Sequence, residues 1–318
     1  MREKIAKLLI LLIGLALAAG LIFLGFRFGA FDFLPGCAGA PAPADEKQPL
    51  VPAPARHGQL SVYFIDVGQG DAAVLVSPAG KTMLIDAGES IYAGRVARFL
   101  GELGVQHIDV LVATHAHSDH IGAMPQLIRR FSIGGFVTTA VTAENVYSAA
   151  LDAALTEKGV KTRAVWSGET IEWDESCSVT VLSPVLGCEY SQSDLNDGCL
   201  MLRVEYGGTA FIFTADATVH AEQLSMFHNE KELFEANVLK VAHHGSTTSS
   251  SLGFVETVGA ETAVISVGAK NPYGHPDFDV VNRLKSVCGD ILRTDELGAI
   301  AVFSNGETLE YAFQKPRG

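Results

Sequence analysis

Three histidines and an aspartate stand within six residues in the segment "HAHSDH", residues 115–120. The segment directly follows the apolar run "IDVLVAT", which is typical of a buried strand. Imidazole and carboxylate groups at the end of a strand are suited to bind Zn²⁺, Mn²⁺ or iron. A solvated polar loop would account for one histidine, but not for three with an aspartate between them. The segment therefore predicts a metal site, and the ligands that it offers are His115, His117, Asp119 and His120.

The remaining ligands must come from later in the chain. Asp216 ends the apolar run "TAFIFTAD", and His243 and His244 end the run "NVLKVAHH". These side chains would complete two metal sites that share Asp216 as a bridge, although Asp216 could also cap the helix that follows it. Two cations about 3.5–4 Å apart can hold a hydroxide and clamp an in-line displacement at phosphorus or at an acyl carbon. Asp119 would orient that hydroxide or accept its proton.

Candidate substrate contacts follow in two loops. In "NPYGHP", His275 could donate a proton to a leaving alkoxide, while Asn271 and Tyr273 could bind phosphate oxygens. The two prolines could instead simply make this loop rigid. In "HHGSTTSSS", Ser246 and the threonines after it could donate to a phosphate at a helix start, or cap a helix over residues 250–259. The other histidines lack companions, which predicts surface positions for His57, His107, His220 and His228.

The elements that must position these residues follow from the apolar pattern. Three short β-rich runs, separated by "GQGD" and "PAGK", predict a β-meander over residues 60–87. Further strands are predicted at 108–114, 178–184, 199–207, 209–216, 237–243, 262–268, 291–295 and 299–304. Helices are predicted at 92–104, 123–131, 143–159, 217–227, 249–259 and 279–287. Two β-rich halves, each followed by helices, predict an α+β fold with two sheets packed face to face and helices outside.

The N-terminal part differs from the rest of the chain. Leu8–Phe26 is a run of 19 residues without a charge, and as a helix it would span about 28 Å, close to the thickness of a bilayer. The basic residues before it predict a cytoplasmic N-terminus and an external remainder. We expect residues 1–30 to form a cytoplasmic tip and transmembrane anchor, and residues 31–57 an Ala/Pro-rich linker. A cleaved signal segment or a lipoprotein site at Cys37 would give a secreted or lipid-anchored protein instead.

The folded part is acidic. The 318 residues carry 23 basic and 36 acidic side chains, and those from Asp45 onward carry 19 basic and 34 acidic ones, a net charge of −15. This balance argues against a large sequence-independent grip on nucleic acid. Bound divalent cations could supply local positive charge for a polyanionic substrate. The four cysteines of this part could be free buried thiols or form disulfides outside the cytoplasm, and their spacing does not decide between these.

The motifs together resemble a known family. "HAHSDH" matches the HxHxDH signature of the metallo-β-lactamase superfamily. With "FIDVGQGDAAVLVSPAGKTMLIDAG", "FIFTADA", "LKVAHHGSTTSSS", "ISVGAKNPYGHP" and "RTDELGAIAV", the chain resembles the hydrolase domain of the ComEC-type DNA-uptake proteins of competence, over about residues 60–304. The resemblance implies an αββα metallo-β-lactamase sandwich over residues 58–318. It places the metals at one edge of two mixed sheets.

The resemblance also implies roles for single residues. His115 and His117 would hold one metal, Asp119 and His120 the second, and Asp216 would bridge them. One of His243 and His244 would be a late ligand and the other would face the substrate, and the pattern leaves open which. Asp86 would brace the histidine loop. The residues expected to shape the neighbouring turn are Asp66 and Asp71.

One departure from the family pattern concerns the first metal. Many members have a further histidine ligand before the bridging aspartate, whereas residues 121–215 hold no histidine here. Asn196 or Asp197 would take that place. An amide oxygen is a weaker ligand for zinc, so the first site is expected to be looser or to prefer a harder cation such as Mn²⁺.

These observations predict a membrane-tethered, extracytoplasmic hydrolase with two divalent cations, Zn²⁺ or Mn²⁺. The resemblance implies a phosphodiesterase or nuclease that acts on single-stranded DNA. One apolar segment cannot conduct DNA, so a stand-alone hydrolase is expected rather than a channel. Two alternatives are a phosphodiesterase for a cell-wall polymer such as teichoic acid and a non-catalytic metal-binding adaptor with the same fold. The oligomeric state stays open.

Overall fold

The computed structural model describes residues 48–141, 143–191 and 193–317. The predicted membrane anchor, the alternative signal segment, Cys37 and most of the predicted linker lie outside these residues. Among the helices of the described ranges, none combines the length and apolar character needed to cross a bilayer. From Pro49 onward the chain forms one compact unit. Leu50 is buried in its core, so this unit begins before the boundary predicted at Gly58.

The first sheet is mixed. Its strands, in spatial order, are β14 (Leu309–Phe313), β13 (Ile300–Ser304), β1 (Leu60–Phe64), β2 (Ala73–Val76), β3 (Thr82–Ile85), β4 (His107–Ala113), β5 (Ser132–Thr139) and β6 (Thr162–Val165). The pairs β1–β2 and β2–β3 are antiparallel, which confirms the predicted meander. From β3 to β6 the strands are parallel, so the carboxyl ends of β3 and β4 lie at the same edge.

The second sheet is mixed as well. Its strands, in spatial order, are β12 (Asp290–Arg293), β11 (Thr262–Ile265), β10 (Val238–Lys240), β9 (Thr209–Phe213), β8 (Met201–Tyr206) and β7 (Cys177–Ser183). β7, β8 and β9 are antiparallel, whereas β9 to β12 are parallel. In the parallel part Phe213 lies beside Lys240, so the loops that follow β9 and β10 leave the sheet next to each other.

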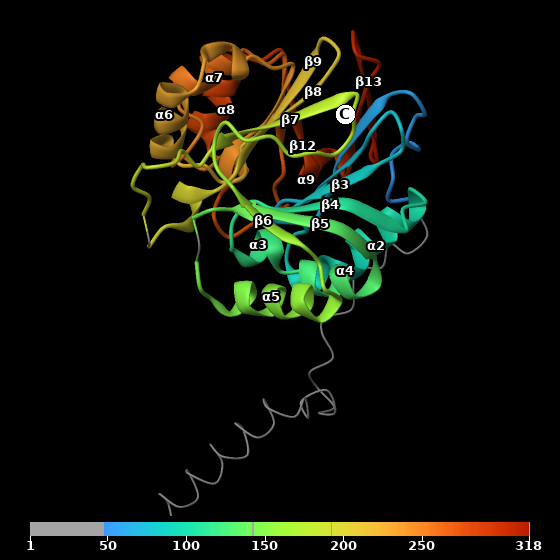
Figure 1. Cartoon of the computed structure of the whole chain (residues 1–318). Coiled ribbons are helices and arrows are strands. Elements are labelled where there is room, and N and C mark those ends of the chain that lie inside the picture. The colour runs from blue at the N-terminus through green and yellow to red at the C-terminus, as the bar shows by residue number, and fades with distance from the viewer. Residues whose placement is uncertain (1–47, 142, 192, 318) are drawn as a thin grey trace, which may run out of the picture. The chain divides into compact units, whose positions relative to one another are not determined.

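Helices cover the outer faces of the two sheets (Figure 1). On the first sheet they are α2 (Ala93–Glu102), α4 (Met124–Arg130) and α5 (Val146–Lys158). On the second sheet they are α6 (Val219–His228), α7 (Leu252–Val258) and α8 (Phe278–Lys285). Shorter helices are α3 (Ser118–Ile121), α9 (Thr294–Leu297), η2 (Ser90–Tyr92), η3 (Leu195–Gly198), η4 (Lys231–Leu233) and η5 (Ala242–Gly245). The predicted α+β fold with two mixed sheets and outer helices is confirmed.

The alternation of side chains along β1 shows how the layers are joined. Val62 and Phe64 point into the apolar core between the sheets, where Phe64 stacks on Phe213 of β9 with ring centroids 5.8 Å apart. Tyr63 points to the other face, into the core beneath the helices, and packs edge-on against Phe99 of α2. Because both faces of this strand are buried, its sequence is apolar at nearly every position.

The C-terminal strands depart from the predicted division into two halves. β13 and β14 do not extend the second sheet: β13 pairs with β1 and β14 pairs with β13, so both lie at the edge of the first sheet. Three strands, β5, β6 and β14, were not predicted at all. In β5 the run "SIGG" weakens the strand pattern, and Gly134 is needed there because a Cβ atom would meet the Asp109 carbonyl oxygen at 2.5 Å.

The turn between β1 and β2 presses directly on the histidine loop. The backbone N–H of Asp71 donates to the Asp119 carbonyl, with 3.1 Å between N and O. Gly70 has φ +140°, and an added Cβ would collide with that same carbonyl oxygen.

We therefore expect Gly70→Ala to lower the free energy of unfolding through both a strained backbone, about 1–2 kcal/mol, and a steric collision, about 1–3 kcal/mol. Gly80→Ala is the matched control, because Gly80 also has positive φ but has nothing within 4 Å of the added Cβ. Urea unfolding of both variants measures the difference. Equal losses would show that the contact with the histidine loop is unimportant.

Candidate metal centre

The histidine loop begins where β4 ends and is fixed from behind by Asp86. The Asp86 carboxylate accepts from the Thr114 backbone N–H at 2.9 Å and from the Thr114 hydroxyl at 2.7 Å. It also lies 2.7 Å from Nδ1 of His120. All three side chains are buried. Asp86 thus holds the loop and turns Nε2 of His120 toward the centre of the site, the position that the resemblance implied for it.

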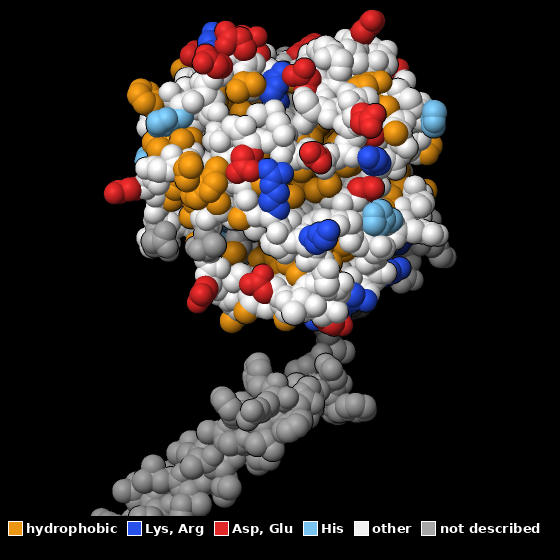
Figure 2. Space-filling model, viewed as in Figure 1, with side chains coloured by type: hydrophobic (Ala, Val, Ile, Leu, Met, Phe, Trp, Pro, Cys, Tyr) orange, Lys and Arg blue, Asp and Glu red, His pale blue; other side chains and the backbone are white. Residues whose placement is uncertain are grey.

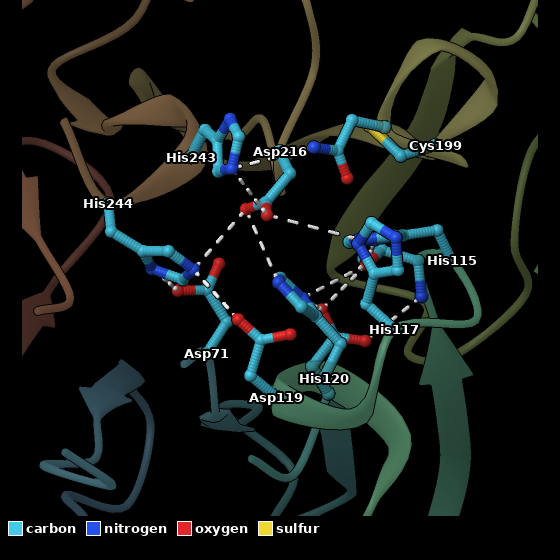
Figure 3. Close-up of polar contacts among 12 residues, drawn as sticks. Asp71, His115, His117, Asp119, His120, Cys199, Asp216, His243 and His244 are labelled. Atoms are coloured by element: carbon cyan, nitrogen blue, oxygen red, sulfur yellow. Dashed lines mark hydrogen bonds and ion pairs between the residues drawn. The ribbon is translucent and has the colours of Figure 1, made fainter. Parts of the chain in front are cut away.

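Asp216 lies at the centre of the cluster (Figure 3). Its Oδ1 is 3.3 Å from Nε2 of His120 and 3.7 Å from Nε2 of His244. Its Oδ2 is 3.9 Å from Nε2 of His115 and 3.7 Å from Nε2 of His243. Each carboxylate oxygen therefore faces its own pair of histidines, as expected of a bridging ligand.

Helix capping does not explain Asp216. The N-cap of α6 is Thr218, whose side chain accepts from the Ala221 backbone N–H. The loop after β10 reaches Asp216 because the His243 backbone N–H donates to the Ala215 carbonyl at 2.9 Å. The parallel pairing of β9 and β10 thus places the two histidines of this loop against the aspartate.

Among the described residues, three groups of donor atoms converge closely enough to hold a cation. In each group all atoms lie within 4.8 Å of one another; the first comprises His115, His117 and Asp216, and the second Asp119, His120, Asp216 and His244. A third group, Asp71, Asp86 and His120, contains the two carboxylates that brace the site from behind. His244 is therefore placed among the ligands, while His243 stands beside Asp216 on the pocket side.

The chemistry of these donors fits a metal ion. Nε2 of His120, Nε2 of His244 and Oδ1 of Asp216 are buried and accept or donate no hydrogen bond. Nδ1 of His244 lies 2.9 Å from the Ser266 carbonyl oxygen, which can only accept, so Nδ1 carries a proton and the neutral ring has its lone pair on Nε2. Buried polar atoms are normally satisfied, and a cation among these three would satisfy them all.

The buried carboxylates of the site need positive charge beside them to stay ionised. Burial alone would lower the pKa of His244, but Asp216, Asp119 and Asp71 outweigh it and raise that pKa to about 10. Burial raises the pKa of Asp216, yet His120 and His244 hold it well below its usual range. Divalent cations would take over the charge that protons on these histidines otherwise provide, and their binding would release the protons.

Asp71 does more than shape a turn. Its Oδ2 forms an ion pair of 2.7 Å with Nζ of Lys240, and its Oδ1 lies 3.3 Å from Nδ1 of His244. The Lys240 side chain is only 4% exposed. Lys240 was not predicted, although a lysine inside the apolar run "NVLKVA" indicates a buried partner. Asp66, by contrast, does shape the turn, since its Oδ1 accepts from the Gly68 backbone N–H at 3.2 Å.

A cavity of about 360 Å³ opens over the two ligand groups. Its lining includes side chains of the histidine and aspartate cluster, namely His117, Asp119, Asp216, His243 and His244, and further Gln69, Ala116, Ser118, Asn145, Tyr147, Tyr273 and His275. Asn145 was not predicted; its amide donates to the Ala116 carbonyl at 2.8 Å and caps α5, which ties that helix to the histidine loop.

Two side chains predicted to contact the substrate make hydrogen bonds within the protein instead. The Asn271 amide is used up inside its own loop, where it accepts from the backbone N–H groups of Tyr273 and His275 and donates to the Gly268 and His275 carbonyls. Ser246 is buried and bonds to Thr248 at 3.0 Å. It does not cap a helix either, because α7 begins at Leu252 with Ser251 as its N-cap.

The candidates for the missing middle ligand lie differently. Asp197 is engaged elsewhere, accepting from the Thr218 hydroxyl at 2.6 Å and lying 3.0 Å from Nδ1 of His220. His220 is exposed, as predicted, and has Asp197 as a partner. Asn196 is buried with Nδ2 3.5 Å from Nε2 of His243, and its Oδ1 has no hydrogen-bond partner.

His275 lies in the pocket wall, with its ring centroid 5.9 Å from that of His243. Burial, together with His243 and His244, lowers the pKa of His275. A general acid must carry a proton before it acts, and the lowered pKa disfavours the protonated form at neutral pH. The role of proton donor therefore stays a prediction for this residue.

Residues 65–268 match the family model described as the metallo-beta-lactamase superfamily. The chain therefore belongs to this superfamily and has the fold of its metal-dependent hydrolases. The metallo-beta-lactamase fold protein YhfI from Bacillus subtilis superposes with a TM-score of 0.50 at 12% identity, covering 80% of this chain and 100% of YhfI. At this low identity the likeness concerns the fold alone.

Two competence proteins are similar in sequence. ComE operon protein 3 of Bacillus subtilis strain 168 is 31% identical over 266 residues, covering 78% of this chain and 33% of that protein. Competence protein ComA of Neisseria gonorrhoeae is 32% identical over 243 residues, covering 76% of this chain and 32% of that protein. The chain thus spans about a third of the length of these curated relatives. The predicted resemblance to competence-type hydrolase domains is confirmed.

The buried pair of Asp71 and Lys240 gives a prediction about stability. Lys240→Met would leave the Asp71 carboxylate buried without its ion-pair partner, so we expect the free energy of unfolding to fall by about 3–5 kcal/mol. The double variant Asp71→Asn/Lys240→Met should lose less, because no isolated charge remains. Urea unfolding of the two single variants and the double variant measures the coupling. Losses that simply add would contradict it.

Proposed function

We propose that this chain is a dinuclear metal-dependent phosphodiesterase that cleaves single-stranded DNA outside the membrane. The observation that carries the proposal is the carboxylate of Asp216, whose two oxygens face separate pairs of histidines beneath an open cavity. When bound, a pair of divalent cations supplies Lewis acidity and lowers the pKa of a water ligand. The similarity to competence proteins supports phosphodiester chemistry, and the apolar run Leu8–Phe26 supports membrane tethering.

Asp119 is suited to orient the nucleophile rather than to take its proton. Burial raises the pKa of Asp119, but His120 and His244 outweigh it and hold this pKa below its usual range. Its Oδ2 lies 3.3 Å from Nε2 of His244, and its side chain borders the cavity. A carboxylate that stays ionised can accept a hydrogen bond from a hydroxyl group and fix its direction, which positions it for attack.

The cavity walls favour nucleic acid over a polyol phosphate. The described residues that line the cavity include neither lysine nor arginine, so bound cations would supply the attraction for phosphate. Two wall residues, Tyr147 and Tyr273, are 42% and 68% exposed. Exposed aromatic rings stack on unpaired bases regardless of sequence. A cell-wall polymer of alditol phosphates has no rings to stack on them, which makes it the second candidate.

The surface charge also favours short unpaired strands over long duplexes. On the face shown in Figure 2, lysine and arginine side chains are scattered among acidic ones and do not gather in one patch. Binding along a duplex depends on many clustered phosphate contacts. Recognition would therefore be confined to the cavity and the few nucleotides that reach it.

We expect the purified full chain to hydrolyse bis(p-nitrophenyl) phosphate with Zn²⁺ or Mn²⁺ and to lose this activity with a chelator. Asp119→Ala should lower kcat about 10²–10⁴-fold, the range for a positioned catalytic group. Asp152→Ala on the exposed face of α5 is the control and should retain activity. The absence of turnover with Zn²⁺, Mn²⁺ and Mg²⁺ would leave the metal-binding adaptor as the better explanation.

We expect Tyr147 and Tyr273 to stack on the bases of the substrate and not to contact its phosphate backbone. We expect Tyr147→Ala and Tyr273→Ala each to raise KM for a single-stranded oligonucleotide about 10-fold, because stacking contributes about 1–3 kcal/mol per base. An abasic oligonucleotide of equal length should be cleaved equally by these variants and the parent protein. Phe227→Ala, which removes an exposed aromatic ring outside the cavity, is the control. Equal effects on both substrates would favour the cell-wall polymer.

A further inference from the structure

The two ligand groups are unequal, and the first has one donor fewer than the second. The group with His244 offers four donor atoms, whereas the group with His115, His117 and Asp216 offers three. Protein sites for zinc usually have four ligands, with one position left to water or substrate when the site is catalytic. A further side chain close to the first group could therefore complete it.

His243 stands beside this group. Its Nε2 lies 3.7 Å from Oδ2 of Asp216, the same oxygen that faces Nε2 of His115. The neighbouring His244 has the same distance, 3.7 Å, to Oδ1. Figure 3 shows His243 and His244 on one side of Asp216, with His115 and His117 on the other. The imidazoles of His243 and His244 therefore each face a different carboxylate oxygen of Asp216. His244 already belongs to the second ligand group.

The ring of His243 is oriented as the other ligand histidines are. Its Nδ1 lies 2.9 Å from the Thr248 hydroxyl, so the opposite nitrogen is the one turned toward Asp216. His120 and His244 are arranged in the same way, with Nδ1 bound to Asp86 and to the Ser266 carbonyl. An outer hydrogen bond of this kind fixes the tautomer and orientation of a metal-binding histidine.

The backbone supports a dedicated position. His243 and His244 have φ values of +49° and +55°, and non-glycine residues rarely adopt this left-handed conformation. Such strain persists only where the surrounding structure enforces it, and it concentrates at functional sites. Two successive left-handed residues turn both imidazoles onto the same aspartate, which an extended chain with alternating side chains would not do.

We propose that His243, through Nε2, is the fourth protein ligand of the cation held by His115, His117 and Asp216, with Thr248 as its positioning residue. The inference rests on the dinuclear centre of the proposed function. It replaces the expectation that Asn196 or Asp197 takes this place. With three imidazoles and one carboxylate the first site is suited to zinc, rather than to the harder cation expected from an amide ligand.

The test measures metal binding to the full chain by competition with a chromophoric chelator, and metal content after dialysis. The parent protein should bind two Zn²⁺ ions. His243→Ala should retain one ion with unchanged affinity and bind the other more than about 100-fold more weakly, beyond the 10–100-fold that loss of an outer hydrogen bond costs. Thr248→Val should weaken the same ion about 10-fold. His275→Ala, which removes a pocket histidine without a contact to Asp216, should keep both.

A second variant separates the loss of the metal ligand from misfolding of the protein. His243→Gly removes the imidazole but suits the positive φ, so the backbone is relieved. Added free imidazole should restore the first ion to this variant. In the Co²⁺-loaded protein, His243→Gly should change the visible spectrum of one ion, and imidazole should restore it.

The proposal is wrong if His243→Ala and His243→Gly keep both ions at parental affinity while phosphodiester turnover falls, since His243 then acts on the substrate. It is equally wrong if Asn196→Ala, and not the His243 variants, loses the first ion. Because the readout is metal binding, a chain that needs His243 for its first ion but cleaves no phosphodiester would support the ligand assignment and overturn the proposed function.

Discussion

The buried carboxylate of Asp216 is the constraint around which the site is arranged. A carboxylate cannot stay ionised in an apolar core unless positive charge or several hydrogen-bond donors compensate it. Here the compensation comes from four histidines, brought in by the loops after β4 and β10. The parallel pairing of β9 and β10 matters for this reason. It places Asp216, which follows β9, beside the histidines that follow β10 at one edge of the second sheet.

Each histidine is in turn held from the side that faces away from the centre. Asp86 holds His120, the Ser266 carbonyl and Asp71 hold His244, and the Thr248 hydroxyl holds His243. These outer partners come from segments far apart in the chain, so only the complete sandwich assembles them. Asp71 would bring another uncompensated charge, and the buried Lys240 neutralises it. The outer layer therefore sets both the direction of the lone pairs and the charge available for cations.

The sequence was sufficient to predict the elements whose apolar pattern leads directly into functional residues. The β1–β3 meander, the histidine loop and Asp216 follow from short apolar runs that end in polar residues, and the structure assembles them as expected. It was insufficient where a residue's partner is distant or the strand pattern is weak. The segment "SIGGFVTT" has too weak a strand pattern to predict β5, and no local pattern predicts that β13 pairs with β1. The sequence also did not show that Asn271 and Ser246 are engaged in hydrogen bonds of their own loops, because polar loop residues serve loop geometry as readily as substrate.

The distribution of charge links metal binding to substrate binding. Among the described residues that line the cavity, the ionisable groups are carboxylates and histidines, and the positive side chain nearest to them in the core, Lys240, is already paired with Asp71. Without cations the histidines and carboxylates compensate one another and leave little positive charge for a phosphodiester. With two divalent cations the same groups become ligands, and the local charge becomes positive. For the proposed phosphodiesterase, affinity for phosphate would therefore depend on the loaded centre, and the neutral tyrosine and amide side chains of the cavity would select only among the groups attached to that phosphate.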